Sequence, residues 1–217
     1  MLRILLINPN ASVATTEMMV AIARKAAGER FAVTGATVPH GPPMIVDPDA
    51  LAAAGPEVVA IARAHADACD GIIVAAFGDP GLTEIRAGGM PPAVGIAEAA
   101  MLEAAGGGRR FGVATTTPRL VAGIDASVAL LGLADRYAGT RVTPGDPHAL
   151  VADPARLDAA LAAIVRACIA EDGAAAVIIG GGPLGQAAQR LQPLFTEPII
   201  APIPAAVSQL AARLTLR

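Results

Sequence analysis

The sequence predicts an α/β fold made of two similar lobes, each a parallel sheet of roughly four strands covered by helices. One observation is that short, continuous apolar runs bounded by turn residues alternate with helical patterns along the whole chain. This alternation is typical of strands buried on both faces of a parallel sheet. The other is that two sequence features recur about a hundred residues apart, which indicates a duplication.

The expected elements follow one another in a regular order. Apolar runs predict strands at 2–7, 31–38, 71–76, 93–96, 111–114, 140–143, 175–179 and 199–203. Helical patterns lie between these runs, at 13–27, 56–68, 97–105, 118–131, 154–170, 184–191 and 205–214. Asp153 directly before Pro154 indicates a helix start, because Asp accepts hydrogen bonds from free N–H groups and Pro fits the first turn. Glycines 106–108 close the helix before them.

The repeat predicts how the chain divides. An Asp-Gly pair and an apolar run lead into Gly-rich loops at 77–81 and again at 180–185, and 3–10 is loosely echoed by 110–118. We therefore expect one lobe of 1–97 plus 205–217 and a second of 98–204, tightly associated as one unit. Both repeated loops follow strands. Since open α/β sheets bind ligands at the carboxyl ends of their strands, we expect one cleft between the lobes.

Composition narrows the functional class. Hydrophobic residues make up 54% and charged residues 16%, which excludes a disordered chain. No uncharged apolar run reaches the roughly 18 residues of a membrane span, and the amino-terminal run is too short for a signal peptide. We therefore expect a soluble, cytoplasmic protein without a membrane partner. A net charge of −3 and 2% aromatic residues provide neither phosphate neutralisation nor base stacking, so we expect no nucleic acid partner.

Cysteine and histidine give no sign of a metal or a disulfide. Cys69 and Cys168 are the two cysteines, and the three histidines are His40, His65 and His148. This scatter fits neither a disulfide framework nor a zinc site, so we expect no metal. Both thiols are expected to be small buried hydrophobes, and His40 and His148 to lie in loops. We expect no cofactor and a small-molecule ligand, and leave homo-oligomerisation open.

Two of the loops carry amide and hydroxyl groups at helix starts. Asn8 and Asn10 end the first predicted strand, before a helix whose free N–H groups attract anions, so a carboxylate or ureido group could bind there. The alternative is that Asn10 or Ser12 only caps the helix and Asn8 shapes a turn. Thr115 and Thr116 follow a later strand in a run of three threonines, which favours a binding site.

Glycine dominates the other two loops. Phe77 and Gly78 precede Asp79, which we expect to cap the following helix rather than act as a general acid. The run 180–185 formally matches a dinucleotide fingerprint, but it lies near the carboxyl end, and only Glu197 is near the position about 20 residues on where the fingerprint has an acidic residue. We favour a backbone pocket for an oxyanion, formed around 180–182.

Taken together, these loops resemble the hydantoin and allantoin racemase branch of the aspartate/glutamate/hydantoin racemase family. The resemblance rests on Asn-Pro-Asn at 8–10, Phe-Gly-Asp-Pro-Gly-Leu at 77–82, 111–119, and the stretch 171–182, in this order. It implies two pseudo-symmetric lobes with the active site in the cleft. It also implies proton exchange at an acidic carbon by two Cys thiols on opposite sides, without cofactor or metal.

The sequence departs from that family at both thiols. Ala76 stands at the position of the first Cys and Gly181 at the position of the second, and neither side chain can transfer a proton. Cys69 cannot replace the first thiol, because seven residues of strand separate it from Ala76 by about 23 Å. The expected binding positions, carried by the four loops, are Asn8, Asn10, Phe77, Gly78, Thr115, Thr116, Gly180 and Gly182.

Three functions stay open from the sequence. The first is a racemase-family protein that binds a small carboxylate, an amino acid or a cyclic ureide but has lost the two-thiol mechanism. The second is a catalytically silent ligand-binding protein. The third is a different lyase or isomerase on the same scaffold, with Asp79, Thr116 or Glu98 handling a proton.

Overall fold

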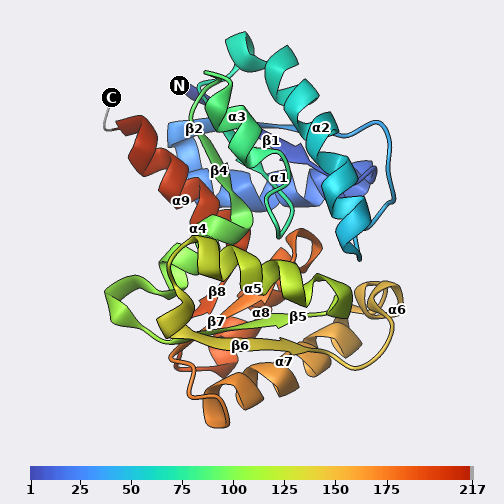
Figure 1. Ribbon diagram of the computed structural model, residues 1–217, viewed down its shortest axis with the longest axis vertical. Coiled ribbons are helices and arrows are strands. Elements are labelled where there is room, and N and C mark those ends of the chain that lie inside the picture. Colours follow the sequence, from blue (N-terminus) through green and yellow to red (C-terminus); the bar gives the residue numbers. More distant parts are fainter. Residues whose placement is uncertain (216–217) are drawn as a thin grey trace.

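The computed structural model describes residues 1–215, with position 183 described by its backbone alone, and it confirms the predicted fold. Two four-stranded parallel sheets have the orders β2-β1-β3-β4 and β6-β5-β7-β8, one in each lobe (Figure 1). The order is therefore the same in both lobes, as a duplication predicts. The strands are β1 Leu2–Asn8, β2 Phe31–Thr37, β3 Gly71–Val74, β4 Ala93–Gly95, β5 Phe111–Thr115, β6 Tyr137–Val142, β7 Ala176–Gly180 and β8 Ile199–Ile200.

Helices connect the strands and cover both sheets. They are α1 Val13–Ala27, α2 Pro48–Ala64, α3 Leu82–Ala87, α4 Ile96–Ala104, α5 Val121–Leu130, α6 Pro147–Val151, α7 Pro154–Ala170, α8 Gly185–Leu191 and α9 Pro202–Thr215. Side-chain caps fix several starts: Ser12 accepts from the N–H of Thr15 at α1, and Asp153 accepts from the N–H of Arg156 at α7. Within residues 1–215, none of these helices is long and apolar enough to cross a lipid bilayer.

The hydrophobic core has three layers. The largest lies between the sheets, where α1, α4 and α9 pack against strand residues of both lobes, such as Leu6 and Phe111. A second layer covers the outer face of the second sheet with α7 and α8, and a third covers the outer face of the first sheet with α2. Because the central layer belongs to both lobes, it fixes the loops of one lobe against those of the other.

The final helix packs against elements of both proposed lobes. It contacts α1, α4, β3 and β4, and Arg213 donates to the carbonyl of Ala93 and to Glu98. The division into 1–97 plus 205–217 and 98–204 stays a prediction, because α4 lies largely in 98–204 and α9 itself begins at Pro202. Residues 216 and 217 lie outside the described part of the chain.

Several expected bounds were wrong. The helix expected at 56–68 begins at Pro48, because Asp47 caps it through the N–H of Ala50, and Pro56 lies inside the helix rather than at its start. The strand expected at 71–76 ends at Val74, and the strand expected at 140–143 begins at Tyr137. The short helices α3 and α6 were missed, and His148, expected in a loop, lies in α6.

Candidate functional site

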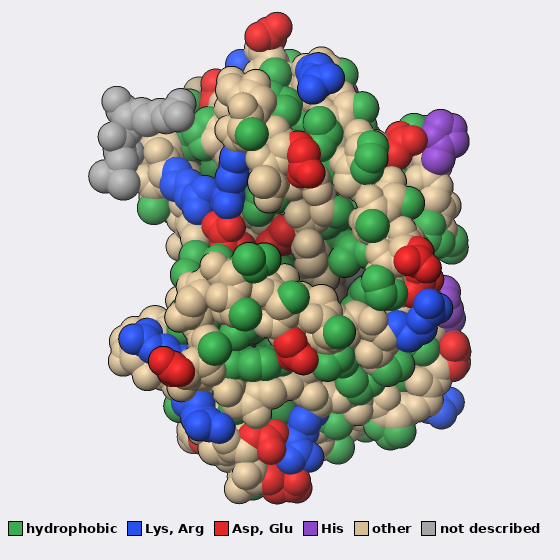
Figure 2. Space-filling model, in the orientation of Figure 1, with side chains coloured by type: hydrophobic (Ala, Val, Ile, Leu, Met, Phe, Trp, Pro, Cys, Tyr) green, Lys and Arg blue, Asp and Glu red, His purple; other side chains and the backbone are tan. Residues whose placement is uncertain are grey.

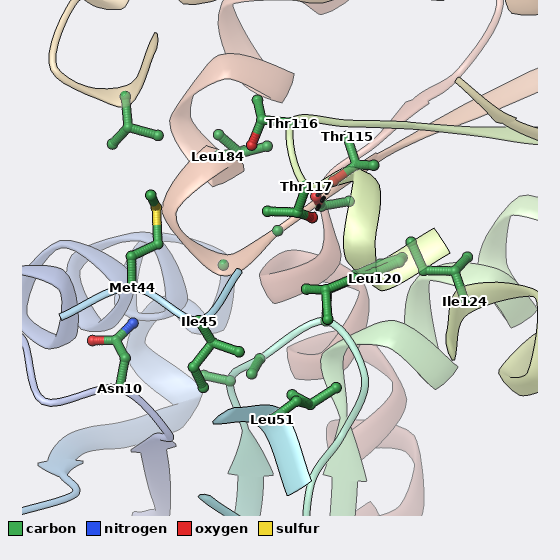
Figure 3. A pocket seen from close by; sticks show the side chains of 17 residues that line it. Asn10, Met44, Ile45, Leu51, Thr115, Thr116, Thr117, Leu120, Ile124 and Leu184 are labelled. Carbon is green, nitrogen blue, oxygen red and sulfur yellow. Dashed lines mark hydrogen bonds between the residues drawn. The ribbon is translucent and has the colours of Figure 1, made fainter. Parts of the chain in front are cut away.

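A cavity of about 60 Å³ lies between the lobes, at the carboxyl ends of β1, β3, β5 and β7 (Figure 3). Its lining comprises Asn10, Met44, Ile45, Leu51, Ala75, Ala76, Phe77, Thr115, Thr116, Thr117, Leu120, Ile124, Val151, Gly180, Gly181, Gly182 and Leu184. Most of the expected site positions are therefore brought together here, from all four loops. Asn8 and Gly78 are the expected positions outside this lining.

Asn8, which does not line the cavity, orients the side chain of Asn10 through hydrogen bonds. The buried Asn8 side chain donates to Asn10 Oδ1 at 2.9 Å and to Thr16 Oγ1 at 2.9 Å, and its own Oδ1 accepts from the N–H of Asn10 at 3.1 Å. Asn10 Oδ1 also accepts from the N–H of Ser12 at 3.0 Å. With its oxygen bound by two donors, the amide of Asn10 can offer only N–H groups to a ligand. The capping interpretation is confirmed for Ser12, which caps α1, while ligand binding at Asn10 stays a prediction.

The threonine run closes the opposite side of the cavity. Thr115 Oγ1 donates to the carbonyl of Gly180 at 2.9 Å, which joins the ends of β5 and β7, and it lies 3.1 Å from Thr117 Oγ1. Thr116 is buried and lines the cavity. A hydroxyl can donate or accept, so the threonine side of the cavity suits either kind of ligand group.

The glycine loop is shaped by close contacts. A Cβ at Gly180 would lie 3.2 Å from the ring of Phe77, and a Cβ at Gly182 would lie 2.9 Å from the carbonyl oxygen of Ala75. Glycine at these two positions therefore lets the loop 180–182 lie close to Ala75 and Phe77 of the other lobe. Gly181 has a φ of 151°, and a Cβ there would lie 3.1 Å from Leu184. Leu184 thus fills the space that a side chain at Gly181 would need.

An apolar strap between β2 and α2 covers the cavity and was missed from the sequence. It spans 39–47 and contributes Met44 and Ile45 to the lining. The N–H of Ala11 donates to the carbonyl of Pro42 at 3.1 Å, and Arg119 lies 3.8 Å from Asp47, which links the strap to both lobes. The signal available in the sequence was the apolar cluster 44–46 inside a Pro-rich loop.

Asp79 does cap a helix, but not the one expected. Its carboxylate accepts from the N–H groups of Ala97 at 2.9 Å and Glu98 at 2.8 Å, at the start of α4, whereas the start of α3 at Gly81 has no side-chain cap. Desolvation raises the pKa of Asp79 to about 7, although both hydrogen bonds oppose this rise. Glu98 is bound by Arg86 and Arg213. Neither carboxylate lines the cavity, so neither is placed to exchange a proton with a ligand there.

Neither cysteine lies at the cavity. Cys69 precedes β3, at the end opposite the cavity, and Cys168 in α7 packs near Gly112 at the start of β5. Burial raises the pKa of the Cys69 thiol and raises that of Cys168 to about 11. Buried thiols of this kind are inert. Within residues 1–215, no cluster of three or more His, Cys, Asp or Glu residues forms a candidate metal site.

Comparison with known proteins places this geometry in context. Residues 4–210 match the family model described as Asp/Glu/Hydantoin racemase. A hydantoin racemase from Rhizobium meliloti is 31% identical over 210 residues, which are 96% of this chain and 87% of the relative. The structure of allantoin racemase from Klebsiella pneumoniae superposes with a TM-score of 0.94 at 30% identity, covering 100% of this chain and 89% of that chain. The structure of allantoin racemase from Pseudomonas fluorescens superposes with a TM-score of 0.93 at 26% identity, covering 99% of this chain and 91% of that chain.

Proposed function

This chain belongs to the Asp/Glu/hydantoin racemase family, and on that premise we propose that its cavity binds a cyclic ureide of the hydantoin type. The observation that carries the proposal is the character of the lining. Among the described residues, its side chains are amide, hydroxyl and apolar, and none is charged. Aspartate or glutamate would bring two carboxylates and an ammonium group, and burying these charges without partners of opposite sign is costly.

A hydantoin ring suits this lining, because its polar groups are neutral N–H and C=O groups. We assign the amide N–H of Asn10 to a ring carbonyl, and the Thr116 hydroxyl to a ring N–H or C=O group. The backbone of Phe77 and of the loop 180–182 supplies further donors and acceptors. The names of the relatives from Rhizobium meliloti and Klebsiella pneumoniae, a hydantoin racemase and an allantoin racemase, support the same class of ligand.

We further propose that the cavity does not exchange the ring C5 proton through a pair of thiols. The family resemblance implies thiols at Ala76 and Gly181, where this chain has neither. Cys69 precedes β3 at the end opposite the cavity, Cys168 lies in α7 against Gly112 near the start of β5, and their raised pKa values disfavour the thiolate that would act as base. Threonine hydroxyls are far too weak as bases near neutral pH.

The binding proposal is tested by thermal unfolding with 5-methylhydantoin, allantoin, L-aspartate and L-glutamate. A ligand present at 100 times its Kd stabilises the native state by about 2.7 kcal/mol, which raises the unfolding temperature measurably. We expect stabilisation by at least one cyclic ureide and none by the two amino acids. Stabilisation by aspartate or glutamate alone would contradict the proposal, as would saturation by NAD.

The chemical proposal is tested separately in deuterated water. Each bound ureide is incubated with the protein, and deuterium at C5 is followed by proton NMR, with protein-free buffer as the control. We expect exchange at the buffer rate. Enzyme-like exchange that persists after treatment with a thiol-alkylating reagent would mean that another base operates in the cavity.

A further inference from the structure

The carboxylate of Asp79 joins a loop of the cavity wall to the first turn of α4. The loop 76–79 follows β3, and its first two residues line the cavity. The N–H of Asp79 donates to the carbonyl of Ala76 at 3.0 Å, which closes a turn in this loop. The Asp79 carboxylate accepts hydrogen bonds from the N–H groups of Ala97 and Glu98. One side chain therefore connects the cavity wall to a helix of the central hydrophobic layer.

The backbone around Asp79 is shaped to make this contact. Among residues 1–215, Asp79 is the one residue other than glycine with a positive φ, at 49°. Such a conformation persists only where the surrounding structure enforces it. Gly95, directly before α4, leaves room for the carboxylate, because a Cβ there would overlap it. A Cβ at Gly182 would lie 3.8 Å from Cδ1 of Ile96, the first residue of α4. The first turn of α4 therefore supports cavity residues of both lobes.

The charged groups nearest Asp79 are paired with one another. The Glu98 carboxylate lies 2.7 Å from Arg86 of α3 and 3.0 Å from Arg213 of α9. Figure 2 shows basic and acidic side chains side by side where α9 and α4 meet the seam between the lobes. Desolvation raises the pKa of Asp79 to about 7; its two hydrogen bonds oppose the rise, the charge of Glu98 adds to it, and Arg86 opposes it. Asp79 is therefore present in both protonation states near neutral pH.

Protonation of Asp79 weakens the link between the loop 76–79 and α4. The ionised carboxylate offers one acceptor oxygen to each of the two N–H groups, whereas a neutral carboxyl carries a proton on one of its oxygens. Hydrogen bonds to an ionised acceptor are also roughly twice as strong as those between neutral groups. The neutral form therefore holds the loop less firmly in the positive-φ conformation that the structure shows.

We propose that Asp79 is a positioning residue, whose ionised carboxylate holds the loop 76–79 in the conformation that binds the ligand. It acts through the backbone of Ala76 and Phe77 and does not itself touch the ligand. The inference rests on the proposed function, because the ligand has to occupy the cavity, and it adds regulation of that same site by pH. Since the ligand prefers the ionised form, its binding makes Asp79 release its proton to the buffer.

The first test is the affinity for 5-methylhydantoin and allantoin, measured by calorimetry at several pH values. If only the ionised form binds, a pKa of about 7 makes the affinity rise about 30-fold from about pH 5.5 to about pH 8. We expect a rise between about threefold and about 30-fold. Asp79→Asn, which cannot ionise, should bind at all pH values as weakly as the natural protein does at about pH 5.5. Asp153→Asn removes the capping carboxylate of α7, outside the cavity lining, and should keep the natural profile.

The second test needs no variant. The carbon-13 resonance of the Asp79 carboxyl group, followed by NMR during a pH titration, reports the pKa of this residue with and without 5-methylhydantoin. We expect the bound ligand to lower the pKa of Asp79 by at least about 0.5, which is the linked equivalent of a threefold preference for the ionised form.

The outcomes separate the inference from the proposed function. If a ureide binds with a flat pH profile, or leaves the pKa of Asp79 unchanged, the inference is overturned and the proposed function stands. A pH profile that persists in Asp79→Asn would also overturn it, because another group, such as a histidine, would then be the one that titrates. If neither ureide binds at any pH, the proposed function fails and the inference fails with it.

Discussion

A side chain added at Gly181 should destabilise the protein much more than one added at Ala76. Gly181 has a φ of 151°, a conformation that costs an L residue about 1–3 kcal/mol. Its Cβ would lie 3.1 Å from the Cγ and Cδ1 atoms of Leu184, which is buried in the second lobe, and such overpacking costs about 1–3 kcal/mol. The sum is about 2–6 kcal/mol. Ala76 is half-buried at the cavity wall, so adding one sulfur there should cost less than about 1 kcal/mol.

The assay is urea unfolding of Gly181→Ala, Gly181→Cys and Ala76→Cys. With a slope of about 2 kcal/mol per molar urea, we expect the midpoint of both Gly181 variants to fall by at least about 1 M. Adding Leu184→Ala to Gly181→Cys should recover part of the loss relative to the sum of the two single changes, which a double-mutant cycle measures. The strain from the positive φ of residue 181 should remain in the double variant.

An unchanged midpoint for Gly181→Ala would refute this reasoning, since the added Cβ alone carries both penalties.

The same crowding at Gly181 should also limit proton exchange in a variant that carries two thiols in the cavity. The pair Ala76→Cys and Gly181→Cys should give less deuterium exchange at C5 of a bound hydantoin than the same pair combined with Leu184→Ala. Equal exchange would show that Leu184 moves aside without cost.

Three further predictions concern other parts of the molecule. Thr116→Val should weaken ureide binding several-fold by removing a hydrogen-bonding group from the cavity, whereas Thr83→Val, at an exposed position of α3, should not, as calorimetry would show. The pKa of Asp79 rises from 3.8 to about 7 on folding, so the native state holds this proton more tightly than the unfolded chain does. The free energy of unfolding should therefore fall as pH rises from about 4 to about 7. Asp79→Asn should flatten this pH dependence, which urea unfolding measures. Arg213→Ala should lower the thermal midpoint, because Arg213 joins α9 to Glu98 and to the carbonyl of Ala93 in β4, and an unchanged midpoint would show that these bonds add no stability.

The strands could be predicted because burial on both faces leaves a direct mark on the sequence. Ile4 and Leu6 face the central layer while Leu5 and Ile7 face the outer one, and all four are 3% exposed or less. Such strands read as continuous apolar runs. The short helices α3 and α6 were not predicted, because six and five residues are too few for a helical period to be visible in the sequence. Pro56 misled the prediction, since it resembles a helix start but lies inside α2.

The site was predictable only where its residues directly follow strands. Asn10, Thr116 and the loop 180–182 could be found because the carboxyl ends of parallel strands meet at one edge. Met44 comes from the strap, where an apolar cluster in a Pro-rich loop was the one local signal, and Leu120 comes from a helix start, where no local pattern indicates a cavity. Capping rules likewise fail for Asp79, because they consider donors two or three residues ahead, and its partners lie 18 and 19 residues along the chain.

The glycine loop shows why one sequence pattern supports several interpretations. In the sequence, three glycines fit a nucleotide loop or an oxyanion pocket, because both need a bare backbone. In the structure, a Cβ at Gly182 would meet Met19 and Ala75 of the other lobe, and a Cβ at Gly180 would meet Phe77 of the other lobe as well as Val113 of its own sheet. A substitution at either position would push the lobes apart as well as alter the cavity. The neighbour of Gly181 is Leu184 of its own loop, so Gly181 is the position where a change tests the cavity while the contact between the lobes is kept.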